Sequence, residues 1–190
     1  MTQHDDIWQG DLVRLRGVEP DDWPLFQALD RDTGVQREGY WITFPRSDER
    51  ARKWALETSA AKPEDDNYRW VIESGDGTPV GSLNTHGCDA RNGTFEFGIT
   101  IAREHWGNGY APDAIRLLLR YFFGERRYQK ATSFVYEFNG RSLAMHRKLG
   151  FQDEGRIRRS HFTNGRHFDT FVLGMTAEEF FERHGPQEPA

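Results

Sequence analysis

The chain has 190 residues, which suits one domain, residues 1–190, with a substantial hydrophobic core. Its net charge of -5 at pH 7 and pI near 5.8 exclude the broad basic surface of a general nucleic-acid binder. The negative charge agrees weakly with a cationic substrate, and its simpler explanation is that surface charge keeps a protein in solution. The single cysteine, Cys88, rules out an intrachain disulfide. No apolar run is long enough to cross a bilayer, and the first ten residues lack the features of a signal peptide. We therefore expect a cytoplasmic protein with no membrane partner.

Hydrophobic periodicity and turn residues divide the chain into strands and helices. The expected elements, in order, are a strand at residues 10–16, helices at 21–32 and 48–61, strands at 68–74 and 79–87, a strand through 95–99, a helix at 111–124, a strand at 129–138, a helix ending at 149, strands at 151–162 and 166–175, a helix at 177–183 and a frayed tail at 184–190. This order predicts a mixed α/β fold with one sheet and helices on both faces.

Local signals support several of these boundaries. Ser47 and Asn139 are placed to cap the helices that follow them, and Gly150 is placed to end the second one. Asn164 and Gly165 form a dipeptide that is typical of a tight hairpin. The last two long strands are therefore expected to pair with each other.

A strand, a glycine-containing loop and a helix follow one another between residues 93 and 123. The loop reads Trp106-Gly107-Asn108-Gly109-Tyr110-Ala111, and Pro112 lies in the first helical turn, where its missing N–H has no helical partner to lose. Free N–H groups at a helix start favour anions, and small residues let a phosphate come close. The segment is therefore either an ordinary turn or a site for a phosphate-bearing ligand.

Two named phosphate loops are excluded. No Lys-Ser or Lys-Thr pair follows the glycines, and Pro112 occupies the third glycine position of the dinucleotide-binding fingerprint.

Two blocks of sequence carry a family resemblance. The first, EFGITIAREHWGNGYAPDA (residues 96–114), resembles the acyl-CoA loop of the GNAT N-acetyltransferase superfamily and is closest to its RimJ/RimL branch, with Trp106 at the superfamily's Gln or Arg position and Asp113 where the branch has Glu. The second, NGRSLAMHRKLGFQDEG (residues 139–155), resembles the branch's N-x-x-S, KLGF and EG pattern. A weaker match, YWITFPRSDERARKWALE (residues 40–57), extends the resemblance over nearly the whole chain.

This resemblance implies a GNAT-like fold, with a mostly antiparallel central sheet, and a reaction. The enzyme it implies moves an acetyl group from acetyl-CoA to a primary amine, which attacks the thioester directly without a metal or a covalent intermediate. The acceptor would be a protein N-terminus or a small amine such as a polyamine, an amino acid or an antibiotic. Such a reaction needs a neutral amine, a donor for the developing oxyanion and a proton for the departing thiolate.

The resemblance also implies where acetyl-CoA binds. Backbone groups of Ile99, Thr100 and Ile101 would pair with pantetheine like an added strand. The N–H groups of Gly107 to Ala111 would hold the pyrophosphate, and Trp106 belongs to the same cofactor-binding loop. Asn139 matches the asparagine that contacts the CoA arm, and this role is compatible with its role as a helix cap.

Two side chains of the following helix are candidates for the step at sulfur. Ser142 matches the serine of N-x-x-S, and it is either a proton donor, a thioester contact or a local cap. His146 stands at the position, seven residues after the asparagine, where the superfamily often has a tyrosine that protonates the thiolate. The two residues are four apart and so share a helix face; the alternative for His146 is an exposed helical histidine.

Two residues compete as the base that removes the proton of the amine. Glu96 lies on the strand before the loop, at a position where many superfamily members use a glutamate through water. His161 stands near a position where RimL-like proteins carry a glutamate, and an imidazole titrates near neutral pH. Each is alternatively a solvent-facing strand residue, and we favour Glu96 slightly.

The acceptor pocket has its own candidates. In the family, the loop between the first two helices lies over the substrate amine, which selects Tyr40, Trp41 and Phe44. The alternative is that these aromatic residues anchor the loop in the core. Asp169 matches an acidic residue of the family's hairpin and is either structural or amine-binding.

Other functions find less support in the sequence. His86 and Cys88 lie two apart on a strand, but no third ligand at a known spacing accompanies them, so we expect no metal. A GxSxG serine elbow is absent from the sequence. A non-catalytic acyl-CoA-binding domain and a transferase of another acyl group remain as alternatives, and a homodimer is plausible for this fold.

Overall fold

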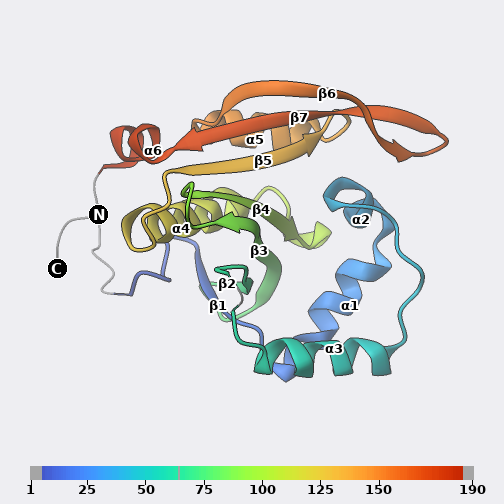
Figure 1. Cartoon of the computed structure of the whole chain (residues 1–190). Helices are drawn as coiled ribbons and strands as arrows, with labels where there is room; N and C mark the ends of the chain where they lie inside the picture. Colours follow the sequence, from blue (N-terminus) through green and yellow to red (C-terminus); the bar gives the residue numbers. More distant parts are fainter. Residues whose placement is uncertain (1–5, 64, 186–190) are drawn as a thin grey trace. The chain divides into compact units, whose positions relative to one another are not determined.

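A computed structural model describes residues 6–63 and 65–185 (Figure 1). Its strands are β1 (Val13–Gly17), β2 (Arg69–Ser74), β3 (Pro79–Asp89), β4 (Thr94–Ile101), β5 (Lys130–Tyr136), β6 (Gln152–Thr163) and β7 (Arg166–Thr176). Its α-helices are α1 (Trp23–Arg31), α2 (Thr33–Gly39), α3 (Asp48–Ala60), α4 (Tyr110–Gly124), α5 (Gly140–Leu149) and α6 (Ala177–His184), with short 3₁₀ turns η1 (Pro20–Asp22) and η2 (Arg103–His105).

The seven strands form one sheet in the order β1-β2-β3-β4-β5-β7-β6. The pairs β1–β2, β2–β3, β5–β7 and β6–β7 are antiparallel, whereas β4 and β5 are parallel. A parallel pair needs a crossover connection, and α4 supplies it. The predicted mixed α/β class with a mostly antiparallel sheet is confirmed.

The chain divides into two compact units. The first comprises Met1–Thr85 and Gly98–Leu117, and the second comprises His86–Phe97 and Leu118–Ala190. The strands β3 and β4 and the helix α4 each contribute residues to both units. The single domain expected from chain length stays a prediction.

In the first unit, helices pack on the sheet through two small apolar clusters. Phe26 of α1 packs with Val18 and Val71, and Trp54 of α3 covers this cluster with its ring centroid 4.6 Å from that of Phe26. The second cluster joins Leu29, Val35 and Ala102 of α1, α2 and the segment after β4, with Leu25 and Trp106 packed against it. These contacts bring α2 to the start of the glycine loop.

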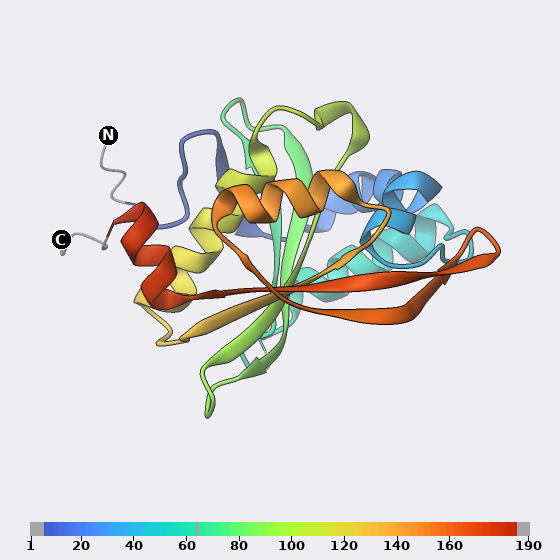
Figure 2. The ribbon, with the colours of Figure 1, turned by 90° about the horizontal axis from the view of Figure 1, so that it is seen from above.

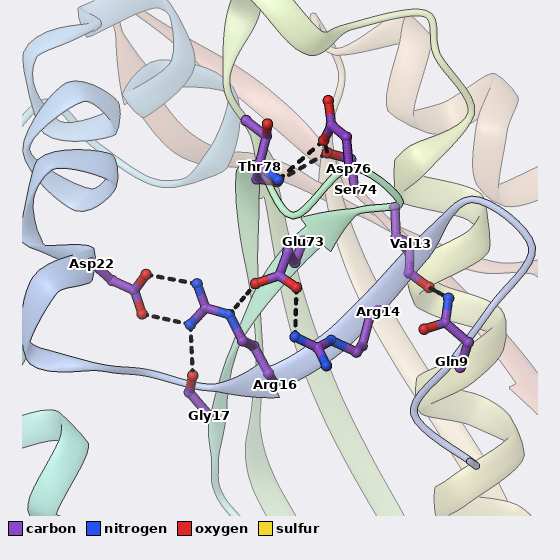
Figure 3. A network of polar contacts seen from close by, with 10 residues as sticks. All are labelled: Gln9, Val13, Arg14, Arg16, Gly17, Asp22, Glu73, Ser74, Asp76 and Thr78. Carbon is purple, nitrogen blue, oxygen red and sulfur yellow. Dashed lines mark hydrogen bonds and ion pairs between the residues drawn. The ribbon is translucent and has the colours of Figure 1, made fainter. Parts of the chain in front are cut away.

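Charged side chains tie the first two strands of this unit together (Figure 3). Arg16 on β1 donates to both carboxylate oxygens of Asp22 at 2.7 and 2.8 Å and to Glu73 on β2 at 2.5 Å. Arg14 donates to the other oxygen of Glu73 at 2.6 Å. A bidentate guanidinium–carboxylate pair fixes geometry as well as charge, so this network sets the register of β1 on β2 and holds η1 against them.

An aromatic cluster fills the second unit. Phe95 on β4 stacks on Phe122 of α4 at 4.4 Å between ring centroids, and Tyr128 meets both rings edge-on or tilted at 5.5 and 5.1 Å. Phe123 meets Phe180 of α6 at 5.7 Å. Large rings bury much area per residue, which compensates for an apolar content of only 36%.

The structure differs from the predicted elements at several places, and three of these differences have a local cause. The first strand begins at Val13, because Gly10 N–H donates to the Val13 carbonyl and closes a turn there. The helix α2 was not predicted, because Val35 is its one buried residue and gives no helical periodicity. The strand β5 ends at Tyr136, where Asn139 N–H donates to the Tyr136 carbonyl.

Part of the predicted frayed tail and part of the segment tested for a signal peptide, residues 186–190 and 1–5, lie outside the described residues. Among the described helices, none has the length and apolarity to cross a membrane.

Candidate functional site

The predicted glycine loop lies in the first unit and opens α4. Gly107 and Gly109 have φ angles of +84° and +81°, a left-handed conformation that side chains with a Cβ rarely adopt. A Cβ on Gly109 would lie 3.0 Å from Cδ1 of Leu12, whereas a Cβ on Gly107 would meet nothing within 4 Å. The helix then begins at Tyr110, so Gly109, Tyr110 and Ala111 carry the N–H groups that a helix start leaves unpaired.

Trp106 fixes the loop to the end of β4. Its indole Nε1–H donates to the carbonyl oxygen of Ile101 at 2.8 Å. The guanidinium of Arg103 lies over the same ring, 4.7 Å from its centroid. The carbonyl of Ile101, one of the three residues predicted to pair with pantetheine, is therefore engaged within the protein.

An ion pair ties this segment to α2. Asp32 caps α2 by accepting from the N–H groups of Gly34 and Val35, and Arg103 donates to both of its oxygens at 2.6 and 2.8 Å. The Arg103 guanidinium holds the pKa of Asp32 well below its usual range. The N-terminus of α2 and the start of the loop therefore share one carboxylate.

The aromatic loop that follows α2 is exposed. Tyr40, Trp41 and Phe44 are 53%, 54% and 93% exposed, which contradicts the alternative that they anchor the loop in the core. The loop starts beside β4, because a Cβ on Gly39 would lie 3.5 Å from Oγ1 of Thr100. The first unit therefore brings the start of this loop next to a predicted pantetheine-pairing residue.

In the second unit, Asn139 organises the start of α5. Its Oδ1 accepts from the N–H of Ser142 at 3.1 Å, which confirms the predicted cap. Gly150, with φ at +112°, ends the helix in the left-handed conformation, also as predicted. The cap places Ser142 in the first turn, one turn before His146.

Ser142 and His146 are in contact. Nδ1 of His146 lies 2.9 Å from the Ser142 carbonyl oxygen and 3.2 Å from Ser142 Oγ. A carbonyl oxygen can only accept, so the first contact assigns the proton of the neutral ring to Nδ1. Ser142 Oγ can then accept from the ring and still donate its own proton.

His146 is a core residue rather than an exposed helical one. It is 2% exposed, and its ring packs against Phe97 and Phe151 at centroid distances of 5.9 and 5.1 Å. Burial lowers the pKa of His146 below its usual value, so the ring is neutral near pH 7. Its Nε2 is buried and has no hydrogen-bond partner among the described residues.

Glu96 has a neighbour that the sequence did not reveal. Oε2 of Glu96 on β4 lies 3.3 Å from Nε2 of His86 on β3, and the two side chains are 38% and 50% exposed. Gly87, with φ at +58°, brings the backbone of β3 past this carboxylate. A signal existed in the sequence, since alternation on two neighbouring strands places both residues on polar positions, but the pairing register was needed to bring them opposite each other.

His161, the second base candidate, is also buried. It is 8% exposed and stacks on Tyr136 of β5 at 3.8 Å between ring centroids. Burial lowers the pKa of His161, which keeps its imidazole neutral near pH 7. Its Nε2 lacks a hydrogen-bond partner within residues 6–63 and 65–185. The alternative of a solvent-facing strand histidine is therefore wrong for His161.

Asp169 is engaged on both carboxylate oxygens. Oδ1 accepts from the backbone N–H of Arg159 at 2.8 Å, and Oδ2 accepts from Nε of Arg156 at 2.6 Å. The Arg159 N–H, together with the Arg156 guanidinium, holds the pKa of Asp169 below its usual range. This geometry favours the structural reading of the residue over amine binding.

The comparison with known proteins agrees with this geometry. Residues 13–152 match the family model for the acetyltransferase (GNAT) domain. The chain is 38% identical over 178 residues to the SPbeta prophage-derived uncharacterized N-acetyltransferase YokL of Bacillus subtilis, covering 94% of this chain and 97% of that protein. It is 26% identical over 172 residues to the spermidine N(1)-acetyltransferase of Escherichia coli, covering 90% of each.

Solved structures share the fold. The spermidine N-acetyltransferase of Vibrio cholerae in complex with CoA and spermine superposes with a TM-score of 0.77 at 22% identity, covering 89% of this chain and 98% of that one. An acetyltransferase of the GNAT family from Bacillus anthracis gives a TM-score of 0.76 at 19% identity, covering 90% and 98%. With the family match over residues 13–152, these findings show that the chain belongs to the acetyltransferase (GNAT) family and is an N-acetyltransferase.

Proposed function

We propose that the protein transfers the acetyl group of acetyl-CoA to a primary amine, as a member of the RimJ/RimL-like branch. The observation that carries this proposal is the loop between β4 and α4, where Gly107 and Gly109 adopt left-handed conformations directly before a 15-residue helix. Backbone N–H groups at such a helix start suit a pyrophosphate. Acetyl-CoA would supply the acetyl group as a thioester, which a neutral amine attacks directly.

The residues present fit this group. The loop at residues 106–111 would hold the pyrophosphate, and Ile99 and Thr100 would pair with pantetheine, whereas the Ile101 carbonyl is already bonded to Trp106. The amide of Asn139 would contact the CoA arm while its Oδ1 keeps the helix cap. Nε2 of His146 is a buried acceptor without a partner in the described part of the chain, and an amide N–H of a ligand would satisfy it.

Ser142 is the better proton donor for the departing thiolate. Its hydroxyl keeps a proton to give, because Nδ1–H of His146 points at the serine. His146 itself would need a second proton on Nε2, and burial opposes that charge. We therefore assign proton donation to Ser142 and assign to His146 the orientation of the serine.

Glu96 remains the first candidate for the base, acting through water, and His161 the second. Glu96 is partly exposed and so accessible to water, and its contact with His86 gives the proton a second acceptor. His161 carries an unpartnered, neutral Nε2, which is the form a base requires.

The acceptor would contact the exposed aromatic side chains of Tyr40, Trp41 and Phe44. Relatives named as spermidine acetyltransferases make a small amine the first class to examine, and a protein N-terminus is the second. A homodimer is also part of this proposal, because closed two-fold dimers are the commonest assembly of soluble enzymes.

Calorimetric titration with acetyl-CoA, followed by thiol release over a panel of amines and N-terminal peptides, tests this function. We expect micromolar binding (about −8 kcal/mol) and thiol release with one acceptor class. The variant Asn139→Asp keeps an oxygen for the cap but removes the amide N–H₂, so it should retain stability and bind acetyl-CoA more weakly. Absence of acetyl-CoA binding by the folded protein would overturn the proposal.

A further inference from the structure

The strand β6 interrupts its pairing with β7 at one place. Ile157 pairs with Thr170 and His161 pairs with Phe168, so β6 uses four residue steps where β7 uses two. The ladder therefore leaves out three residues of β6 as a bulge, namely Arg158, Arg159 and Ser160. Bulges of this kind often lie next to active sites, where they redirect side chains.

The bulge is held in one conformation by side chains around it. Oδ1 of Asp169 accepts from the backbone N–H of Arg159 at 2.8 Å. Ser160 Oγ lies 3.1 Å from the Ile157 carbonyl oxygen and 2.7 Å from Thr170 Oγ1. Arg159 itself has φ at +53°, a left-handed conformation that is costly for a residue with a Cβ. An arginine at a position that suits glycine points to a use for its side chain.

Among the described residues, the two guanidinium groups of the bulge are not held in ion pairs, although the charge of Arg158 acts on the Asp169 carboxylate. The neighbouring carboxylates are already paired: Asp169 and Glu137 with Arg156 at 2.6 and 3.0 Å, and Asp153 with Arg147 at 2.9 Å. In the part of the chain that the structure describes, neither Arg158 nor Arg159 makes an ion pair. Both are exposed, as are all residues of β6 from 152 to 160.

The bulge also adjoins a proposed base. It ends at His161, whose buried ring stacks on Tyr136 at 3.8 Å. In both ribbon views the β6–β7 hairpin continues beyond the end of β5 (Figures 1 and 2). The last residue pair between β5 and β7 is Tyr136 with Thr170, and the bulge begins next to this pair. Arg158 and Arg159 therefore stand three and two residues, respectively, before the second candidate for the base.

We infer that Arg158 and Arg159, held out from the sheet by the β6 bulge, bind an oxyanion on the acceptor, so that the acceptor is an amine carrying a carboxylate or a phosphate rather than a polyamine. This inference rests on the proposed acetyl transfer to an amine. Guanidinium groups bind both oxyanions through charge-assisted hydrogen bonds, often in a bidentate manner. The same two positive charges would repel a polyamine.

Four amines separate the alternatives in a thiol-release assay with the full-length protein. They are 2-aminoethyl phosphate, β-alanine, ethanolamine and spermidine, which carry a phosphate, a carboxylate, no second charge and further positive charges. We expect kcat/KM for one or both oxyanion amines to exceed that for ethanolamine by about tenfold or more, and that for spermidine to be lowest. The oxyanion amine with the higher kcat/KM shows whether the oxyanion on the acceptor is a phosphate or a carboxylate.

Two variants test the arginines themselves. Arg159→Gly suits the left-handed backbone, so the thermal midpoint should not fall, while KM for the preferred amine should rise about tenfold, equal to about 1.4 kcal/mol. Arg158→Gln should act similarly, and both variants should lower kcat/KM for ethanolamine far less than kcat/KM for the preferred amine. The matched control is Arg166→Gln, an exposed arginine of the same hairpin that lies over Phe168 at 4.4 Å and should change neither value.

Three outcomes would overturn the inference. Equal or better turnover of ethanolamine or spermidine would refute it and leave the acetyl-transfer function intact, as would an oxyanion preference that survives in both variants. Turnover of none of the four amines would also refute it. Acetyl-CoA titration with the panel of N-terminal peptides would then decide the proposed function separately.

Discussion

Nε2 of His86 lies 3.3 Å from Oε2 of Glu96, so the favoured base candidate of this enzyme has an imidazole beside it. The two residues come from the neighbouring strands β3 and β4 and are both partly exposed. A carboxylate that removes a proton must pass it on before the next turnover. An imidazole at hydrogen-bond distance can receive that proton and release it to water.

Replacing the carboxylate tests this relationship. Glu96→Gln should lower kcat by about 100-fold or more, the usual contribution of a general base, while acetyl-CoA affinity stays the same. His86→Gln should lower kcat several-fold, and added imidazole should restore part of the loss in His86→Ala. Steady-state thiol release gives both values. An unchanged kcat in Glu96→Gln, with a strong loss in His161→Asn, would transfer the role of base to His161.

The glycine loop allows a test with a matched control. Gly107→Ala introduces a Cβ at φ +84° with nothing within 4 Å, so its effect comes from backbone strain alone. Acetyl-CoA affinity should fall about tenfold by calorimetry. Gly77→Ala, in the turn between β2 and β3, has the same strain at φ +85° and an equally open surrounding, and it should leave the affinity unchanged. Equal affinity losses in the two variants would remove the loop from the binding site.

Asp113 is a structural anchor, although the sequence presented it as a departure from the family's loop. It is 2% exposed, and its carboxylate accepts from the N–H groups of Leu12 and Val13 at 2.8 and 3.0 Å and from Arg116 at 2.8 Å. Asp113→Ala would leave two backbone donors of the β1 start unpaired and should cost about 3 kcal/mol in urea denaturation. Asp113→Asn keeps an acceptor for both and should cost about 1 kcal/mol. Equal stability of both variants and the parent would contradict this assignment.

The buried histidines predict how stability depends on pH. Burial lowers the pKa values of His146 and His161 in the folded state, so between those values and about 6.5 the unfolded chain binds more protons than the folded one. The free energy of unfolding should therefore fall as pH decreases from 7 to 5, by up to about 1.4 kcal/mol per pH unit for each histidine. The carboxylates with lowered pKa, such as Asp153 and Asp169, lose their stabilising contribution only at more acidic pH.

Denaturant titrations at several pH values measure this slope. His146→Phe keeps an aromatic ring packed against Phe97 and Phe151. This variant should remove the contribution of one histidine from the slope of unfolding free energy against pH. A stability that is independent of pH between 5 and 7 would contradict the burial-driven shifts.

Local signals in the sequence sufficed for much of the fold. The glycines at 107 and 109, the cap at Asn139 and the turn at Asn164 and Gly165 act through backbone conformation within a few residues, so their consequences could be predicted without knowing the tertiary structure. The alternation of apolar and polar residues in β4 is also a local signal, and it predicted that Glu96 lies on the opposite face of the strand from Phe95 and Phe97. The helix α2 was not predicted, because Asp32 caps its start and Val35 is its one buried residue, so the sequence has no helical pattern of apolar residues there.

Tertiary structure decided what each candidate side chain can do. Burial of His146 and His161, the engagement of both oxygens of Asp169 and the pairing of Glu96 with His86 depend on contacts between strands and helices far apart in the chain. A strand pattern gives the face of a side chain but not the register of its neighbour, and a one-residue shift would reverse every contact. The sequence alone therefore determined the family, the loop and the order of the elements other than α2, whereas the protonation state and partners of the candidate residues required the folded sheet.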